Sequence, residues 1–315
     1  MPQAEWDLKF LKAVVDGRFH HAWKKSPRIK RIAEAYKSNM RRVEGLVDLP
    51  MDTAESMLMN ERASRPGSSI ERTAAGFRLT DDARRAVAAS AAKLIRAMES
   101  RESSRSRHGL LMVLSSALIG TWTAFESIAT DLWIEAVNRR PTTLGVNALL
   151  APREGESEKQ EGKSEKKPDG FSLETLERYK FNLKHRIGTV VHNEKRKFDF
   201  TSTGGIRNAY LRTFAHRRKD GGIVTRPEVK GWFPEHWYQE LSMLEAIRHV
   251  LVHRGGSIDD AFRYRAKEHP EFSKLNLGDT FPVTGPMIRQ YSTASFLCAS
   301  KLLDGVDDWL SRNPS

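Results

Sequence analysis

The sequence predicts an all-α protein, and three observations favour that fold class. Apolar residues recur at three- and four-residue steps along several long segments, which is the period of an amphipathic helix. No segment shows the alternation of a strand ladder, and neither a βα alternation nor a repeat period is visible. With 315 residues, of which 39% are hydrophobic and 29% charged, the chain is long and apolar enough to bury a core.

The first third, residues 1–100, is predicted to be an additional helical N-terminal region. Apolar residues follow helical spacing from Ile29 to Met40, and we expect Leu46–Pro50 to end that helix. A break is expected at residues 65–69, where Pro and Gly occur together. A second helix is expected from Thr80 to Met98, because Thr80 can cap it and two aspartates follow at the positive end of its dipole.

The remaining residues, 101–315, are predicted to form one helical domain around the segment His108–Arg139. This segment is apolar on almost every side, so we expect it to be central and buried, and Pro141 to end it. Its most apolar part, Leu110–Ile119, is about half the roughly 20 residues needed to span a bilayer. No membrane segment is therefore expected.

The rest of this domain alternates helices with connecting segments. Residues 152–170 are expected to form a flexible charged loop, because Glu154–Pro168 contains no apolar residue. A short extended piece is expected within Leu275–Val283. Helices are expected at Leu173–Leu183, Ile206–Phe214, Pro234–Arg254 and Thr284–Leu310.

The formal net charge of +12 and pI of about 9.8 favour an anionic partner, nucleic acid first and an acidic membrane surface second. Residues 178–230 hold 14 basic against four acidic residues, whereas the chain from Glu235 onward holds nine against 11. A basic solvated surface without a specific partner is the other interpretation. The predicted RNA-binding residues are Lys195, Arg196, Lys197, Arg207, Arg212, Arg217, Arg218 and Lys219.

Several kinds of site are disfavoured by what the sequence lacks. A single cysteine, Cys298, excludes an intramolecular disulfide and a cysteine-based zinc site. With no signal peptide visible at the start of this sequence, a reducing, cytoplasmic compartment is expected. The phosphate-loop, dinucleotide-binding, zincin and α/β-hydrolase motifs are missing, so no cofactor and no metal are expected.

The segment Glu245–Gly256, EAIRHVLVHRGG, is the most informative part of the chain. It places Arg248, His249 and His253 on the last turns of an apolar helix, before two glycines that can end it. A neighbouring Arg favours the neutral imidazole, which can accept a proton near pH 7. A guanidinium can hold a phosphate through two N–H groups. Such a pair can cleave RNA without a metal, because the His moves the 2′-OH proton and the Arg stabilises the phosphorane.

This segment resembles the signature of the HEPN superfamily, in which a His follows an Arg after four to six residues and a polar residue comes directly after the Arg. Four residues separate Arg248 from His253, and His249 takes the polar position. The helix TWTAFESIATDLW, which contains Glu126, and the segment Phe198–Phe214 are similar to parts of HEPN-type proteins. The resemblance covers roughly Arg107 to the C-terminus and leaves the first third of the chain uncovered.

The resemblance implies a HEPN-type bundle that pairs two subunits, with two Arg–His motifs facing one composite cleft. Arg248 would bind and stabilise the scissile phosphate, and His253 would act as general base or acid. His249 would orient or assist. Apart from the resemblance, Glu126 is a candidate to orient Arg248, and the other interpretation is a place on the exposed edge of its helix or a structural pairing with an Arg. The implied function is a metal-independent endoribonuclease that acts as a homodimer on RNA. Members commonly work in toxin–antitoxin, antiviral-defence or RNA-processing settings, so an antitoxin or defence-system partner is expected.

Other interpretations of the same residues remain open. The helix end can be structural, with its Arg and histidines capping carbonyls or pairing with Glu245 or Glu126. The Arg–His spacing also occurs by accident in a basic chain, and Arg186/His192 is the best competing match. His249 and His253 could share a metal ion, although no third ligand is evident.

The rival function is a non-catalytic HEPN-like helical module that binds RNA or a protein partner, and a third is a DNA-directed or metal-dependent nuclease. The aromatic residues Trp122, Phe125 and Trp133 are expected in the core. Four others near the basic region are expected in the core or an interface, with stacking on bases as the alternative: Trp232, Phe233, Trp237 and Tyr238.

Overall fold

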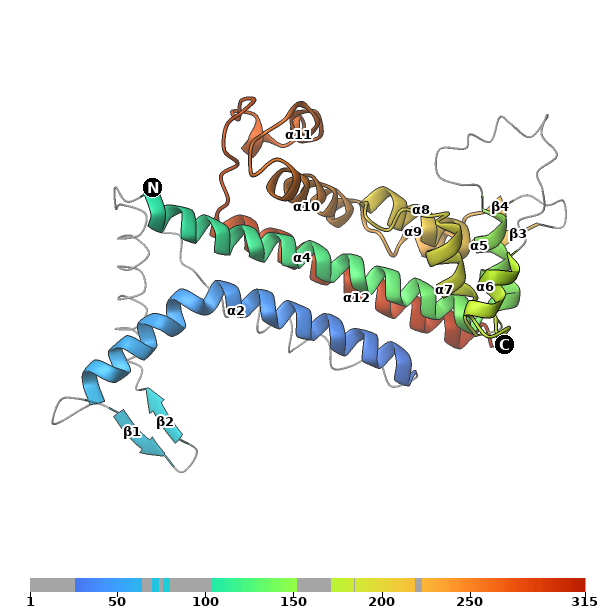
Figure 1. The fold of residues 1–315 in the computed structure, drawn as a ribbon, viewed down its shortest axis with the longest axis horizontal. Helices are drawn as coiled ribbons and strands as arrows, with labels where there is room; N and C mark the ends of the chain where they lie inside the picture. Colours follow the sequence, from blue (N-terminus) through green and yellow to red (C-terminus); the bar gives the residue numbers. More distant parts are fainter. Residues whose placement is uncertain are drawn as a thin grey trace.

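The structure, a computed structural model, is mostly helical, which confirms the all-α prediction. It describes residues 26–63, 70–73, 76–79, 104–151, 171–183, 185–218 and 223–314. Four long helices make up its body (Figure 1): α2 (Pro27–Ala63), α4 (Ser104–Arg139), α10 (Glu235–His253) and α12 (Gly285–Arg312). Helix α4 packs against the other three, and α10 also packs against α12. The helices share one hydrophobic core.

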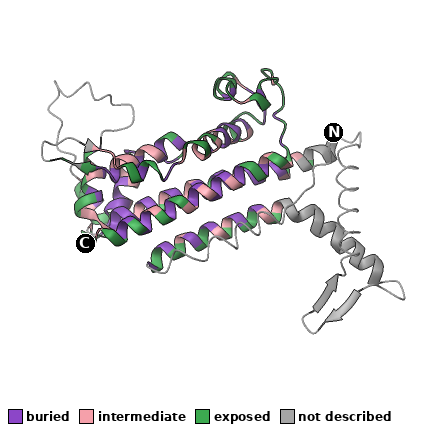
Figure 2. Ribbon diagram, turned by 180° about the vertical axis from the view of Figure 1, so that it is seen from behind, coloured by how far each residue is buried: buried purple, intermediate pink, exposed green. Residues whose placement is uncertain are grey.

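Helix α4 is the central element, as its apolar pattern predicts. Trp122, Phe125 and Trp133 are fully buried in it, which confirms their expected place in the core. Figure 2 shows buried residues along its length. The part Leu111–Arg139 has the length and mean hydropathy, 1.4, that would suit a membrane span, but here it packs against α2, α10 and α12. The helix ends at Arg139, before Pro141, as expected.

Helix α2 lays an apolar face on α4 through Ile29, Ala33, Tyr36 and Met40. The hydroxyl of Tyr36 also hydrogen-bonds the hydroxyl of Ser295 on α12 at 3.1 Å. This part of the N-terminal region therefore belongs to the same core as the rest of the chain.

The prediction that α2 ends within Leu46–Pro50 is wrong, because the helix continues to Ala63. Proline removes one backbone hydrogen bond. The residues after Pro50, MDTAESMLMNERA, are rich in Ala, Met, Leu and Glu, which favour helix.

Helices α10 and α12 begin and end close to their predicted bounds. Thr284 caps α12 by accepting a hydrogen bond from the backbone N–H of Met287. The apolar face of α10 includes the buried residues Leu241, Leu244, Ile247 and Val250.

Shorter helices cover one end of the bundle. Helix α8 is capped by Ser202, and α6 by Ser172. Helix α6 stops at Arg178 rather than at the predicted Leu183, because Lys180 and Phe181 adopt left-handed backbone conformations. The bounds of these elements are η1 Pro141–Gly145, α5 Val146–Leu150, α6 Leu173–Arg178, α7 Ile187–Val190, η3 Val191–Lys195, α8 Thr203–Thr213 and α9 Pro227–Lys230.

The remaining elements are small. Helix α11 (Asp260–Ala266) and η4 (Pro270–Phe272) follow α10. Two antiparallel strand pairs occur that the sequence did not predict: β1 (Ile70–Thr73) with β2 (Gly76–Leu79), and β3 (His216–Arg217) with β4 (Ile223–Val224). They are too short to alter the fold class. The expected extended piece contributes one bridge, between Ser257 and Thr280.

Some predictions lie outside the described residues. They are the break at 65–69, the helix Thr80–Met98 and the charged loop within 152–170. The division of the chain at residue 100 stays a prediction.

Candidate functional site

The C-terminal end of α10 presents the Arg–His segment to solvent. The helix ends where Gly255 and Gly256 take φ values of 60° and 84°, a conformation that favours glycine. The N–H groups of Arg254 and Gly256 both donate to the carbonyl of Val250, at 3.1 and 3.0 Å. This glycine stop, predicted from the sequence, ends the helix directly after the motif.

The structure brings Arg248 and His253 together. The guanidinium Nη1 of Arg248 lies 3.4 Å from Nε2 of His253, within hydrogen-bond reach. The rings of His249 and His253 lie one turn apart, with their centroids 4.9 Å from each other. His249 and His253 are exposed and Arg248 is half-buried. The three predicted catalytic side chains therefore form one cluster, which we call the α10 cluster.

The nearby carboxylates have other partners than this cluster. Glu245 accepts hydrogen bonds from the N–H and hydroxyl of Thr203, and a 2.7 Å ion pair from Arg265. Its pairing with the α10 cluster, one of the structural interpretations, is therefore not observed.

Asp259 pairs with Arg254 at 3.0 Å and caps α11. The N–H of Phe262, followed by Arg254, holds the pKa of Asp259 below its usual value.

Glu126 lies on the central helix α4, near enough to Arg248 for that charge to act on its carboxyl. Burial raises the pKa of its carboxyl, Asp199 adds to the rise, and the Trp122 N–H and the charge of Arg248 oppose it. The Trp122 Nε1–H donates to Oε2 of Glu126 at 3.0 Å. Between these two described side chains, Arg248 and Glu126, no ion pair within 4.0 Å forms, so their interaction is electrostatic and at longer range. The orientation of Arg248 by Glu126 stays a prediction.

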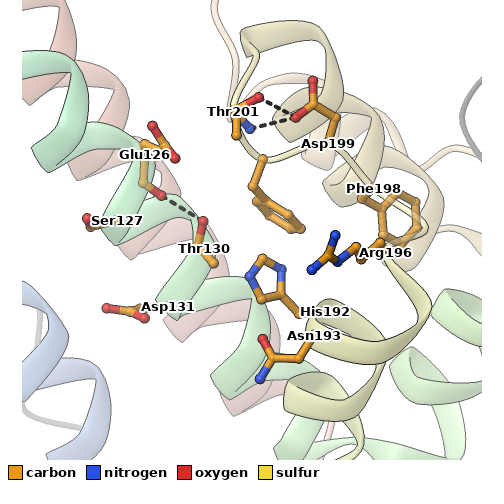
Figure 3. A pocket seen from close by; sticks show the side chains of 11 residues that line it. Glu126, Ser127, Thr130, Asp131, His192, Asn193, Arg196, Phe198, Asp199 and Thr201 are labelled. Atoms are coloured by element: carbon orange, nitrogen blue, oxygen red, sulfur yellow. Dashed lines mark hydrogen bonds between the residues drawn. The ribbon is translucent and has the colours of Figure 1, made fainter.

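Beside Glu126 a cleft of about 840 Å³ opens between α4 and the segment after α7 (Figure 3). We call it the α4 cleft. One wall comes from α4 and the other from η3 and the loop before α8. The buried rings of Phe198 and Phe200 pack edge-on against Trp133 beneath it. The lining residues are Glu126, Ser127, Thr130, Asp131, His192, Asn193, Arg196, Phe198, Asp199, Phe200 and Thr201.

His192 and Arg196 are the basic side chains of the α4 cleft. Burial, and then the charge of Arg196, lower the pKa of His192 below its ordinary value, which favours a neutral imidazole. Its buried Nδ1 has no hydrogen-bond partner among the described groups, and its ring lies edge-on to Phe200, with centroids 5.2 Å apart. Arg196 has a left-handed backbone conformation with φ of 45°. Figure 3 shows the two side chains next to each other in the cleft.

Asp199 lines this cleft from the loop before α8. Burial acts to raise the pKa of Asp199, but hydrogen bonds from Thr201 and Ser202 outweigh it and hold that pKa below its usual value. The carboxylate accepts from the N–H and hydroxyl of Thr201 at 2.8 and 2.6 Å. Gly205 is required here, because a Cβ at this position would overlap the backbone carbonyl of Asp199.

One predicted RNA-binding residue does not lie on the surface. Lys197 is 5% exposed, and its ammonium donates to the carbonyls of Leu149 and Ala151 at the end of α5. A buried ammonium held by two carbonyls cannot contact a phosphate, so its assignment to the RNA-binding set is wrong.

The other predicted RNA-binding residues differ in their surroundings. Arg218 is exposed. The guanidinium of Arg207 lies over the ring of Tyr238, 4.5 Å from its centroid, and Arg212 donates to Asn208 at 2.7 Å. Lys195 lies 5.1 Å from the centroid of Phe171. The side chain of Arg217 and the whole of Lys219 lie outside the described residues.

Two of the four aromatic residues near the basic region lie in the core, as expected. Trp232 and Phe233 are buried and pack edge-on against Tyr210. Trp237 and Tyr238 are half-buried.

The sequence alone did not identify the α4 cleft. In the sequence His192 matches Arg186 by spacing, whereas its neighbour in the cleft is Arg196, four residues later. The pairing of His192 with Arg196 at four-residue spacing was the available signal.

Within the described ranges, no group of three or more His, Cys, Asp or Glu side chains is arranged to hold a metal ion. Comparison with protein-family models, curated protein sequences and solved structures found no match to this chain.

Proposed function

We propose that this protein is a metal-independent endoribonuclease that cuts RNA at the α10 cluster. The observation that carries the proposal is the 3.4 Å approach of Arg248 Nη1 to His253 Nε2 at an exposed helix end. A cation and a proton acceptor at this spacing can reach a phosphate and the adjacent 2′-hydroxyl of one nucleotide. Glu126 on α4 interacts electrostatically with Arg248, without a direct ion pair.

In the proposed reaction, His253 removes the proton from the 2′-hydroxyl, and the 2′-oxygen forms a bond to phosphorus. The bond from phosphorus to the 5′-oxygen breaks, and that oxygen takes a proton from an imidazolium or water. Arg248 stabilises the negative charge that develops on the phosphorane oxygens. His249, one turn before His253, assists in the proton transfers. The products are a 2′,3′-cyclic phosphate and a 5′-hydroxyl.

We further propose the HEPN-type arrangement, in which two subunits meet at their Arg–His motifs. An apolar residue within the motif, Val252, is 45% exposed, and Tyr264 on the neighbouring helix α11 is 72% exposed. Burial of such residues is typical of a subunit interface. RNA would then lie in a cleft shared by two copies, in a toxin–antitoxin, antiviral-defence or stress setting.

The RNA backbone would be guided by the exposed members of the predicted RNA-binding residues, which no longer include Lys197. Arg196 in the α4 cleft and Arg218 near β3 are exposed cations. Each phosphate contact makes the negative slope of log affinity against log salt steeper by roughly 0.7 for single strands, so the loss of one contact makes it shallower by that amount. Arg196→Gln is therefore expected to weaken RNA binding and to reduce this slope, without changing which bond is cut.

The test is incubation of labelled RNA with purified protein in EDTA. Wild type, Arg248→Ala and His253→Ala are compared with two controls, Arg263→Gln on α11 and His236→Ala at the opposite end of α10. Cleavage by wild type and both controls, lost in both cluster variants, is the expected result. Equal cleavage by all five proteins, or sensitivity to EDTA, would contradict the proposal. RNA binding without cleavage would favour the non-catalytic module.

A further inference from the structure

A second large cleft lies at the far end of the bundle from the α10 cluster. It measures about 940 Å³ and opens among the end of α4, η1, α5, β3 and the end of α12. These elements lie together near the C-terminus (Figure 1). Arg139 lies about 20 Å beyond Glu126 along α4, at 1.5 Å rise per residue. The second cleft is therefore separate from the α4 cleft, and none of its lining residues belongs to the α10 cluster. We call this second site the end cleft.

The lining of the end cleft is strongly cationic. It includes four arginines, Arg139, Arg140, Arg226 and Arg312, together with His185 and His216. No carboxylate occurs among the described residues that line it. Two of the arginines have acidic partners outside the lining: Glu135 pairs with Arg139 at 2.7 Å, and Glu228 lies 3.7 Å from Arg226.

Arg140 is held in place without a charged partner among the described side chains. Its guanidinium donates to the carbonyls of Asn313, Leu310 and Arg139, at 2.5, 2.9 and 3.0 Å. Burial, and then the neighbouring charge of Arg139, lower the pKa of Arg140. These three contacts fix the cation between α4 and the end of α12, and they leave its charge uncompensated.

Two buried donors in the end cleft have no acceptor within the part of the chain that the structure describes. They are Nε of Arg226 and Nε1 of Trp309. Trp309 is only 5% exposed. A buried N–H without a partner is costly to the folded protein, because the group has lost its water. Both side chains line the end cleft, although neither of these two nitrogen atoms is itself open to it.

We infer that the end cleft binds the phosphate groups of a nucleotide. Arginine guanidinium groups suit phosphate oxygens, which accept two parallel N–H bonds from each. A cleft of this volume falls within the usual range for small-molecule sites and accommodates a nucleoside together with its phosphates. The ligand would supply the negative charge that the lining of Arg140, Arg226 and Arg312 lacks.

The same chemistry is present in a free nucleoside polyphosphate and in the phosphorylated end of an RNA. The inference does not depend on the proposed nuclease activity, because none of its residues belongs to the α10 cluster. A nucleotide bound here would tie the ends of α4 and α12 together. It would therefore stabilise the fold on binding.

Binding to the full chain is measured by calorimetry with pyrophosphate, ATP, adenosine, and an RNA oligonucleotide with a 5′-phosphate or a 5′-hydroxyl. The double variant Arg226→Gln/Arg312→Gln is compared with wild type and with the control Arg263→Gln on α11. We expect pyrophosphate or ATP to bind, adenosine not to bind, and the double variant to bind at least tenfold more weakly. A preference for the 5′-phosphorylated RNA over ATP would identify the RNA end as the source.

Two results would overturn the inference: no binding of any phosphate compound to wild type, or equal binding by the double variant. Thermal unfolding keeps the test valid if the double variant folds poorly, since pyrophosphate should raise the melting temperature of wild type and of Arg263→Gln. No rise for wild type contradicts the inference. RNA cleavage by the same preparations is scored separately, so failure of the nuclease proposal leaves this result readable.

Discussion

Replacing Lys197 by methionine is expected to destabilise the protein, although the residue lies in a basic run. Its ammonium ties the carbonyls of Leu149 and Ala151 to the segment after η3. Each hydrogen bond to a charged donor contributes roughly 1.5–3 kcal/mol, and relief from burying the ammonium offsets part of the loss. We expect a net loss of about 3 kcal/mol from the free energy of unfolding. At about 2–4 °C for each kcal/mol, the melting temperature should fall by roughly 6–12 °C.

The assay is thermal unfolding followed by circular dichroism, with the neighbouring Arg196→Gln as the matched control. Arg196 is exposed in the α4 cleft, so its replacement should leave the melting temperature within about 2 °C of wild type, the range of most surface substitutions. A melting temperature unchanged by Lys197→Met would refute the reasoning. Equal losses in the two variants would refute it as well, because the effect would then follow charge rather than burial.

Three further outcomes are expected. Because burial raises the pKa of Glu126, the folded state keeps this proton at pH values where the unfolded chain has lost it, so the ionised group destabilises the fold at higher pH. Glu126→Gln should therefore be more stable than wild type at pH 8, with the advantage shrinking on acidification, in denaturant titrations at several pH values. The pKa of His192, followed by NMR, should lie below the ordinary value of a histidine, and wild type should lose stability relative to His192→Asn as pH falls through that ordinary value. Ser202→Ala should remove about 1 kcal/mol from the free energy of unfolding by deleting the cap on Gly205 N–H, as denaturant melts would measure.

Local patterns were sufficient to predict the long helices α4, α10 and α12. The apolar spacing of α4, the cap at Thr284 and the paired glycines after His253 each act within one or two turns of chain. Such signals are readable because the physics is local. The same locality explains why Arg248 and His253, on one helix, were placed together correctly.

Features that depend on distant contacts were not predicted. A run of three basic residues does not reveal which one is buried, and Lys197 is buried only because the end of α5 supplies two carbonyls. The α4 cleft joins Glu126 to His192, which lie on separate elements. The continuation of α2 through Pro50 shows that one missing hydrogen bond is outweighed by the helix-forming residues that follow.

The chemistry of the cut ends tests the central claim most directly. Wild-type protein is incubated in EDTA with an RNA and with the same RNA carrying a single 2′-deoxyribose at the cleaved position, and the products are weighed by mass spectrometry. If His253 and Arg248 act as proposed, the RNA yields a 2′,3′-cyclic phosphate and a 5′-hydroxyl, and the deoxy substitution abolishes cleavage. Products with 5′-phosphate ends, or cleavage at the deoxyribose, would contradict the account.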